Sequence, residues 1–192
     1  MSKSRTRQRR EIKQAANRSR NLLLTGVAVV AVVVIGVAVF LINRSQQFDV
    51  DVSTVPDNSV TYPSLGQTHI PEGSPRPTYN SNPPTSGDHY ANWVPTRVYS
   101  EVVPDELMVH NLEHGHIWLS YRDADDTEAI ETLTQIQSQS PNWIVVTYRP
   151  ENDDRIAVAS WGRLLTLDEP DEAQILAFVA RYRNQAPESI PG

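Results

Sequence analysis

The stretch from Leu22 to Ile42 constrains the fold more than any other part of the 192-residue chain. It runs for 21 residues without a charge, and Thr25 is its only polar side chain. A helix of this length covers about 30 Å, the hydrocarbon thickness of a bilayer. A core helix of a soluble domain would instead show polar positions with a period of about 3.6 residues. The sequence therefore predicts a transmembrane helix over residues 22–42.

A cleavable signal peptide is the main alternative for this stretch. The apolar region of such a peptide normally runs for roughly 7–15 residues and ends at a cleavage site of small residues. Here the apolar run is longer, and it ends in residues that offer no such site: Phe40, Leu41, Ile42, Asn43 and Arg44. We therefore expect an uncleaved anchor.

The distribution of charge predicts how the anchor is oriented. Residues 1–21 carry eight basic side chains and one acidic one, whereas the rest of the chain carries nine arginines and 22 acids, a net charge of −13. Basic residues beside a membrane helix stay on the cytoplasmic side. We therefore expect the basic tail, residues 1–21, in the cytoplasm and an extracytoplasmic C-terminal domain. The protein would then be a single-pass protein of the cell (plasma) membrane, in contact with the lipid bilayer.

Composition also excludes several classes of function. The acidic part lacks the basic footprint that nucleic-acid binding requires, so nucleic acid is not an expected partner. The chain holds no cysteine. Disulfides, thiolate metal sites, cysteine nucleophiles and dithiol redox chemistry are therefore excluded together.

Beyond the anchor, the sequence divides into a spacer and a domain. We assign residues 43–57 to a polar stalk and residues 58–192 to an extracytoplasmic globular domain. Eight of the 14 prolines fall between Pro56 and Pro95. Proline fixes φ and removes a hydrogen-bond donor, so this proline-rich segment should be extended or turn-rich.

The remainder predicts an α+β fold, or a small α/β sandwich, in the order β-α-β-β-α around a small sheet. Alternating, β-branched and aromatic residues indicate strands over 116–121, 143–148 and 156–161, the last continued by 162–167. Apolar residues at helical spacing predict helices over 126–139 and 170–183. We also expect four aromatic side chains in the core: Trp93, Trp118, Trp143 and Trp161.

The segment 104–116 is the densest in groups that bind metals, since it holds three of the five histidines. If the segment is helical, His110 and His114 lie four residues apart on one face and can clasp one metal ion. If it is extended, Met108 and His110 share a face instead. An imidazole with a thioether nearby suits copper better than calcium or magnesium.

A second segment, residues 79–90, contains His89. Pro83-Pro84 favours an extended backbone, and the following Thr-Ser-Gly-Asp is typical of a turn. The turn should hold His89 at a defined position in the loop.

Catalytic patterns are incomplete, so the sequence leaves enzymatic activity open. The string from His110 to His114 matches the His-x-x-Glu-His pattern of some zinc peptidases. Those enzymes need a long helix, which Gly115 and the following strand would cut short. Ser86 is not in a Gly-x-Ser-x-Gly turn, so it is not a nucleophile elbow. A hydrolase with Glu113 as general base would need a bound metal first.

Taken together, the two segments resemble a known family. YNSNPPTSGDHY, the later ELMVHNLEHG and an upstream G-x-x-H-I are similar to motifs of a bacterial family called domain of unknown function 3105. The resemblance runs from about Gly66 to Tyr121 and, more loosely, to the C-terminus. It implies a single-pass membrane protein with an extracytoplasmic domain and no established activity. The motif positions that it marks are His69, His89, His110, Glu113, His114 and Gly115, whereas His116 stands where a small or variable residue is expected.

Our first hypothesis is therefore a metal site, with copper favoured over zinc. The predicted ligands comprise three primary and two additional residues, in that order: His89, His110, His114, His69 and Met108. Glu113 is expected to hydrogen-bond one of these ligands and not to bind the metal itself. The alternative is a non-catalytic interaction or assembly subunit of a membrane protein complex, in which the histidines form a structural polar network.

Overall fold

The computed structural model describes residues 34–36 and 50–189. The chain divides into two units, residues 1–47 and 48–192. Residues 34–36 are helical, and the rest of the predicted membrane helix lies outside the described residues. Among the residues that are described, no helix has the length and apolarity to cross a membrane. The following concerns the second unit.

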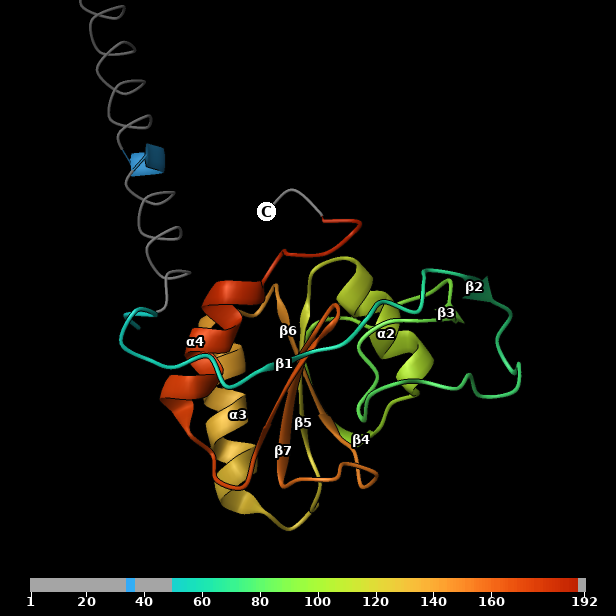
Figure 1. The fold of residues 1–192 in the computed structure, drawn as a ribbon. Helices are drawn as coiled ribbons and strands as arrows, with labels where there is room; N and C mark the ends of the chain where they lie inside the picture. The colour runs from blue at the N-terminus through green and yellow to red at the C-terminus, as the bar shows by residue number, and fades with distance from the viewer. Residues whose placement is uncertain (1–33, 37–49, 190–192) are drawn as a thin grey trace, which may run out of the picture. The chain divides into compact units, whose positions relative to one another are not determined.

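A six-stranded sheet forms the centre of this unit (Figure 1). From edge to edge its strands are β1 (Val60–Thr61), β8 (Arg163–Leu167), β7 (Ile156–Ser160), β5 (Ile117–Tyr121), β6 (Ile144–Tyr148) and β4 (Val98–Val102). β4, β6 and β5 are parallel to one another, whereas β5 and β7, β7 and β8, and β8 and β1 pair antiparallel. The sheet is therefore mixed.

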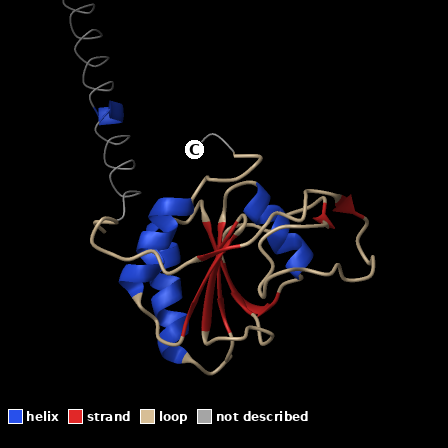
Figure 2. Cartoon of the chain, in the orientation of Figure 1, coloured by secondary structure: helices blue, strands red, loops and turns tan. Residues whose placement is uncertain are grey.

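Three helices cover the two faces of the sheet (Figure 2). α3 (Thr127–Gln139) and α4 (Glu172–Tyr182) lie on one face, and α2 (Asp105–Glu113) lies on the other beside the proline-rich segment. Side chains of a strand alternate between faces. Ile117 and Leu119 of β5 accordingly join the core under α3 and α4, whereas Trp118 packs with the apolar side of α2.

The predicted elements are present as β5, α3, β6, β7 and α4, but a further strand, β8, lies between β7 and α4, and the sheet is larger than predicted. Residues 163–167 do not continue β7 but form the separate strand β8. Gly162, with a φ of +69°, lies in the turn that reverses the chain between the two strands. β4 adds an edge strand to the sheet, and α2 covers its second face. The segment 104–116, which could be helical or extended by sequence, forms a helix over residues 105–113.

The proline-rich segment contains two very short strands, β2 (His69–Ile70) and β3 (His89–Tyr90), which pair in parallel. Pro83 to Gly87 are all buried, so this segment is part of the packed domain. Part of the predicted stalk is attached as well. Arg181 of α4 donates to the carbonyls of Val52 and Val55, and the Tyr182 hydroxyl contacts the Asp57 carboxylate.

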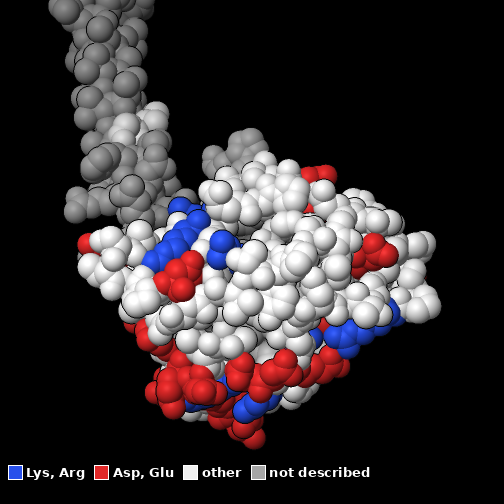
Figure 3. All heavy atoms as spheres, in the orientation of Figure 1, with Lys and Arg blue, Asp and Glu red and all other residues white. Residues whose placement is uncertain are grey.

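Acidic side chains gather at one end of the domain (Figure 3). The loops that precede α3 and α4 are both rich in Asp and Glu. Negative charge at a helix N-terminus is favourable because the backbone N–H groups point toward it. Arg155 offsets part of the repulsion, since it pairs with Asp126, Glu128 and Glu169.

Candidate metal centre

Four side chains that can bind a metal converge between the β2-β3 pair and α2. They are His69, His89, His110 and Glu113, and one ligand atom of each lies within 4.8 Å of the ligand atoms of the others. The strands provide the first two residues and the helix provides the last two. The cluster therefore joins three stretches of chain that are distant in sequence.

The backbone pairing of β2 with β3 places two of these imidazoles side by side. His69 and His89 are register partners, and the His89 N–H donates to the Thr68 carbonyl over 3.0 Å. Just before them, the Gly87 N–H donates to the Gly66 carbonyl. Gly87 has a φ of +122°, a conformation that side-chain-bearing residues rarely adopt. The Pro-Pro-Thr-Ser-Gly-Asp-His stretch thus orients His89 through its backbone.

Helical geometry selects which α2 residues reach the cluster. Residues three and four apart share a helix face, so His110, Glu113 and His114 project together. Met108 is two residues from His110, about 200° around the helix. Its side chain is fully buried in the apolar cluster that contains Leu112 and Trp118. The structure therefore places Met108 in the core behind the helix and not on the face of the imidazoles.

Backbone carbonyls determine the tautomers of the two buried histidines. Nδ1 of His89 lies 2.7 Å from the Gly87 carbonyl oxygen, and Nδ1 of His110 lies 2.7 Å from that of Tyr90. A carbonyl oxygen only accepts, so each Nδ1 carries the hydrogen. The Nε2 atom of a neutral ring is then an acceptor with a free lone pair. Burial lowers the pKa of His110, although the bond to Tyr90 opposes this effect, and the ring is neutral at pH 7.

Glu113 presents a second acceptor to the same space. Its Oε2 lies 3.1 Å from Nε2 of His89 and 3.4 Å from Nε2 of His69, while its Oε1 accepts from Gln67 Nε2 over 2.9 Å. Burial acts to raise the pKa of Glu113, but the hydrogen bond from Gln67 and the contact with His89 outweigh it and keep the pKa below its ordinary value. Glu113 is therefore a carboxylate, with its Oε2 among the imidazole nitrogens.

These two assignments leave a contact that requires positive charge. Nε2 of His89 and Oε2 of Glu113 would both be acceptors, and the two side chains are 0% and 1% exposed. Buried acceptors facing one another are unfavourable unless a proton or a cation lies between them. The contact is therefore a position for either a shared proton or a metal ion. Ligating histidines with Nδ1–H on a backbone carbonyl are the usual arrangement around metals.

The cluster opens to solvent on the side of β2. The His69 side chain is 45% exposed, whereas His89, His110 and Glu113 are buried. The His69 ring stacks on that of His110 at a centroid distance of 5.0 Å, and the His89 ring stands nearly perpendicular to both. His69 is therefore the member of the cluster that contacts solvent.

The other two histidines are placed differently. His114 lies beside the cluster, with its Nε2 2.9 Å from Nε2 of His110, and it belongs to a second group with Glu113 and Glu188. His116 is buried away from both groups, where its Nδ1 contacts Asn111 Nδ2 and its ring meets Trp143. Burial lowers the pKa of His116 to about 4, so it is a neutral core histidine.

Several residues at the site were not singled out by sequence. Gln67 donates a hydrogen bond to Glu113, and its position two residues before His69 could have suggested a shared strand face.

The expectation that Trp93 is a core residue is wrong, since it is 56% exposed and its ring lies 4.8 Å from the ring of His114. Asn111 attaches the Trp93 segment to α2, because its amide both accepts from and donates to the Val94 backbone.

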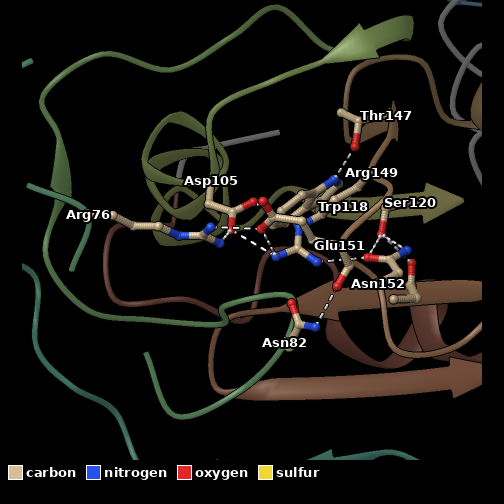
Figure 4. A network of polar contacts seen from close by, with 10 residues as sticks. Arg76, Asn82, Asp105, Trp118, Ser120, Thr147, Arg149, Glu151 and Asn152 are labelled. Atoms are coloured by element: carbon tan, nitrogen blue, oxygen red, sulfur yellow. Dashed lines mark hydrogen bonds and ion pairs between the residues drawn. The ribbon is translucent and has the colours of Figure 1, made fainter. Parts of the chain in front are cut away.

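A buried ion pair fastens the long loop between β2 and β3 to the sheet (Figure 4). Arg149 donates through Nε and Nη2 to the two carboxylate oxygens of Asp105, each over 2.9 Å. Arg76, in the loop, donates to the same carboxylate and to Glu151. The loop that connects His69 to His89 is thus linked to the first residue of α2, which provides the other half of the cluster.

Comparisons with known proteins bear on the family and not on the chemistry. Residues 72–191 match the model of a family described as a protein of unknown function (DUF3105). No curated protein matches the chain, and no solved structure does.

Proposed function

The chain belongs to the DUF3105 family of proteins of unknown function, and from the chemistry of its site we propose that it binds a transition-metal ion. The ligands would be Nε2 of His69, His89 and His110 together with Oε2 of Glu113. The observation that carries this proposal is the buried contact between His89 Nε2 and Glu113 Oε2. A cation there converts two opposed acceptors into two ligands.

The donor set favours zinc as the first ion to test. Three imidazoles and one carboxylate suit a tetrahedral Zn²⁺ site, and imidazole also suits copper. The sequence argument for copper depended on the thioether of Met108, which lies in the apolar core. Zn²⁺ is therefore the ion that we propose, and Cu²⁺ is the competing ion in the test.

We further propose that the site works outside the cytoplasm on a membrane-anchored domain. This rests on the uncharged stretch 22–42 and on the basic residues before it. The anchor would keep the domain that carries the metal site on the outer side of the membrane. On that side the domain would also meet its protein partners, which include a membrane protein complex in this proposal.

The test is elemental analysis of the full-length chain, purified in detergent without a histidine tag. The chain is stripped with chelator, loaded with Zn²⁺ or Cu²⁺, and dialysed. We expect at least one tightly retained equivalent of Zn²⁺ in the wild type and its loss in His89→Gln and Glu113→Gln. His116→Gln is the matched control, because it also changes a buried histidine but should leave retention intact.

A thermal shift provides a second readout. At a free Zn²⁺ concentration 100-fold above Kd, a ligand that binds only the native state stabilises it by about 2.7 kcal/mol. For a domain of about 140 residues this raises the Tm by roughly 9 °C. Equal retention and equal Tm in wild type and His89→Gln would contradict the proposal. The structural network would then be the better account, with His89 and Glu113 joined by a buried hydrogen bond.

A further inference from the structure

We propose that the centre holds two cations, the second at Glu113, His114 and Glu188, with the Glu113 carboxylate shared between the two ions. The ligand atoms of these three residues lie within 4.8 Å of one another. The inference rests on the proposed function, since the first ion is the one held by the buried imidazoles. It extends that function from a single-ion site to a two-ion centre.

Glu188 is delivered to this position by a docked C-terminal segment. The Asn184 N–H donates to the Gly115 carbonyl over 2.8 Å, and the Glu188 N–H donates to the Glu113 carbonyl over 3.1 Å. Gly115 makes the docking possible, because a Cβ on it would lie 2.7 Å from Cα of Asn184. Residues 184–188 are thus bound to the end of α2 through their backbone, and Glu188 is positioned beside the cluster.

The hydrogen-bond contacts of His114 also support a cation at this second position. Its Nε2 lies 2.9 Å from Nε2 of His110, and its Nδ1 lies 3.2 Å from the Glu188 carbonyl oxygen. His110 already uses its hydrogen on Tyr90, so its Nε2 is an acceptor. The two ring nitrogens of His114 therefore face two acceptors, and a ring with Nδ1–H on the Glu188 carbonyl keeps a lone pair on Nε2. That lone pair is available to a cation, in the same arrangement as in His89 and His110, whose Nδ1–H groups also lie on backbone carbonyls.

Glu113 has the free lone pairs that a shared ligand needs. Oε2 faces the imidazoles of the inner group, and Oε1 accepts one hydrogen bond from Gln67. A carboxylate offers about four acceptor positions, so Oε1 retains one for a second ion. Carboxylates that serve two ions about 3.5–4 Å apart are the arrangement of two-metal centres.

The two sites should differ in their affinity for a metal ion and in which ion they prefer. The inner site is buried and rich in nitrogen, whereas the outer site has one imidazole and two carboxylates, of which Glu188 is exposed. Carboxylate ligands suit Mn²⁺ as well as Zn²⁺. We expect the outer site to bind either divalent ion, more weakly than the inner site binds Zn²⁺.

The experiment is a calorimetric titration of the metal-free, full-length chain with ZnCl₂. We expect two binding steps in the wild type, and in Glu188→Gln a weakening of the second step by at least about tenfold with the first step within about twofold. His114→Gln should reproduce this result, and Glu113→Gln should weaken both steps. Glu131→Gln, an exposed acid on α3, is the matched control and should leave both steps unchanged.

The outcomes separate the two proposals. A single step that is unchanged in Glu188→Gln overturns the second site and leaves the first in place. Two steps of which neither responds to Glu188→Gln or His114→Gln also overturn it. No binding in the wild type overturns both proposals. Because Glu188 is exposed, its substitution is not expected to affect folding, which circular dichroism of the variant checks.

Discussion

Replacing Asp105 with asparagine should destabilise the domain strongly. The Arg149 side chain is only 3% exposed, and Asp105 bonds it at two positions. The asparagine side chain would keep one acceptor but present an amide N–H₂ toward a buried guanidinium. The Glu151 carboxylate lies 3.8 Å from Arg149 and is a weaker substitute. The variant therefore leaves a buried positive charge whose remaining anion is an exposed carboxylate 3.8 Å away.

The expected loss can be converted to a thermal shift. Removing one partner of a buried ion pair costs about 3–5 kcal/mol. The asparagine keeps part of the hydrogen bonding, so we expect about 3 kcal/mol for Asp105→Asn. With an unfolding entropy of about 2.1 cal/mol/K per residue, a domain of about 140 residues should melt roughly 10 °C lower.

Urea unfolding and thermal melting of wild type and variant measure this loss. Glu151→Gln is the matched control: its carboxylate is 60% exposed and pairs with Arg76, so the change should cost no more than about 1 kcal/mol. A second check is Arg149→Met combined with Asp105→Leu, which removes both charges and should recover much of the stability. A loss for Asp105→Asn as small as that of the control would refute the reasoning.

Three further outcomes are expected. Gly115→Ala should cost about 1–3 kcal/mol, because φ is +85° and the new Cβ would clash with the Asn184 backbone; urea unfolding and faster proteolysis of the C-terminal segment test this. Asp126→Ala should cost about 1–2 kcal/mol in the same assay, since the carboxylate accepts from Ala129 N–H at the start of α3. The hydrogen bonds from Arg155 hold the pKa of Asp126 below its ordinary value, so the stability from this charge is present above the unfolded-state pKa and is lost as pH falls through the lowered one. The difference between wild type and Asp126→Ala should therefore shrink below about pH 4, and equal differences at about pH 3 and pH 7 would contradict this assignment.

The elements with clear periodicity could be read from the sequence. α3 shows apolar residues at helical spacing, and Ala129, Leu133 and Ile136 are its buried positions. α2 lacks such a signal because its buried side includes His110 and Glu113, polar residues that a sequence pattern assigns to the surface. Its N-cap residue is Pro104, which has no side-chain oxygen, so the sequence also lacks the usual N-cap signal of a helix start.

The site was predictable in its residue types but not in its geometry. The histidine-rich segment and the loop around His89 were both evident from sequence. The distance in space between His89 and the histidines of α2 depends on β2 and β3. Each of these strands is only two residues long, too short for any periodicity in the sequence to reveal. The expectation that Glu113 stands behind a ligand also depended on the side-chain directions of α2. The structure directs its carboxylate between two imidazoles, a position that suits a ligand as well as a hydrogen-bond partner of ligands.

The spacing of the cluster along the chain has a consequence for folding. His69, His89 and His110 are separated by 20 and 21 residues, so one ion bound to all three closes two loops. In the chain-entropy model, closing a loop of about 20 residues with a disulfide removes about 3 kcal/mol of unfolded-state entropy. A chain without cysteine could obtain the same restraint from a metal ion. Unlike a disulfide, this cross-link would form and open with the supply of metal, without an oxidant.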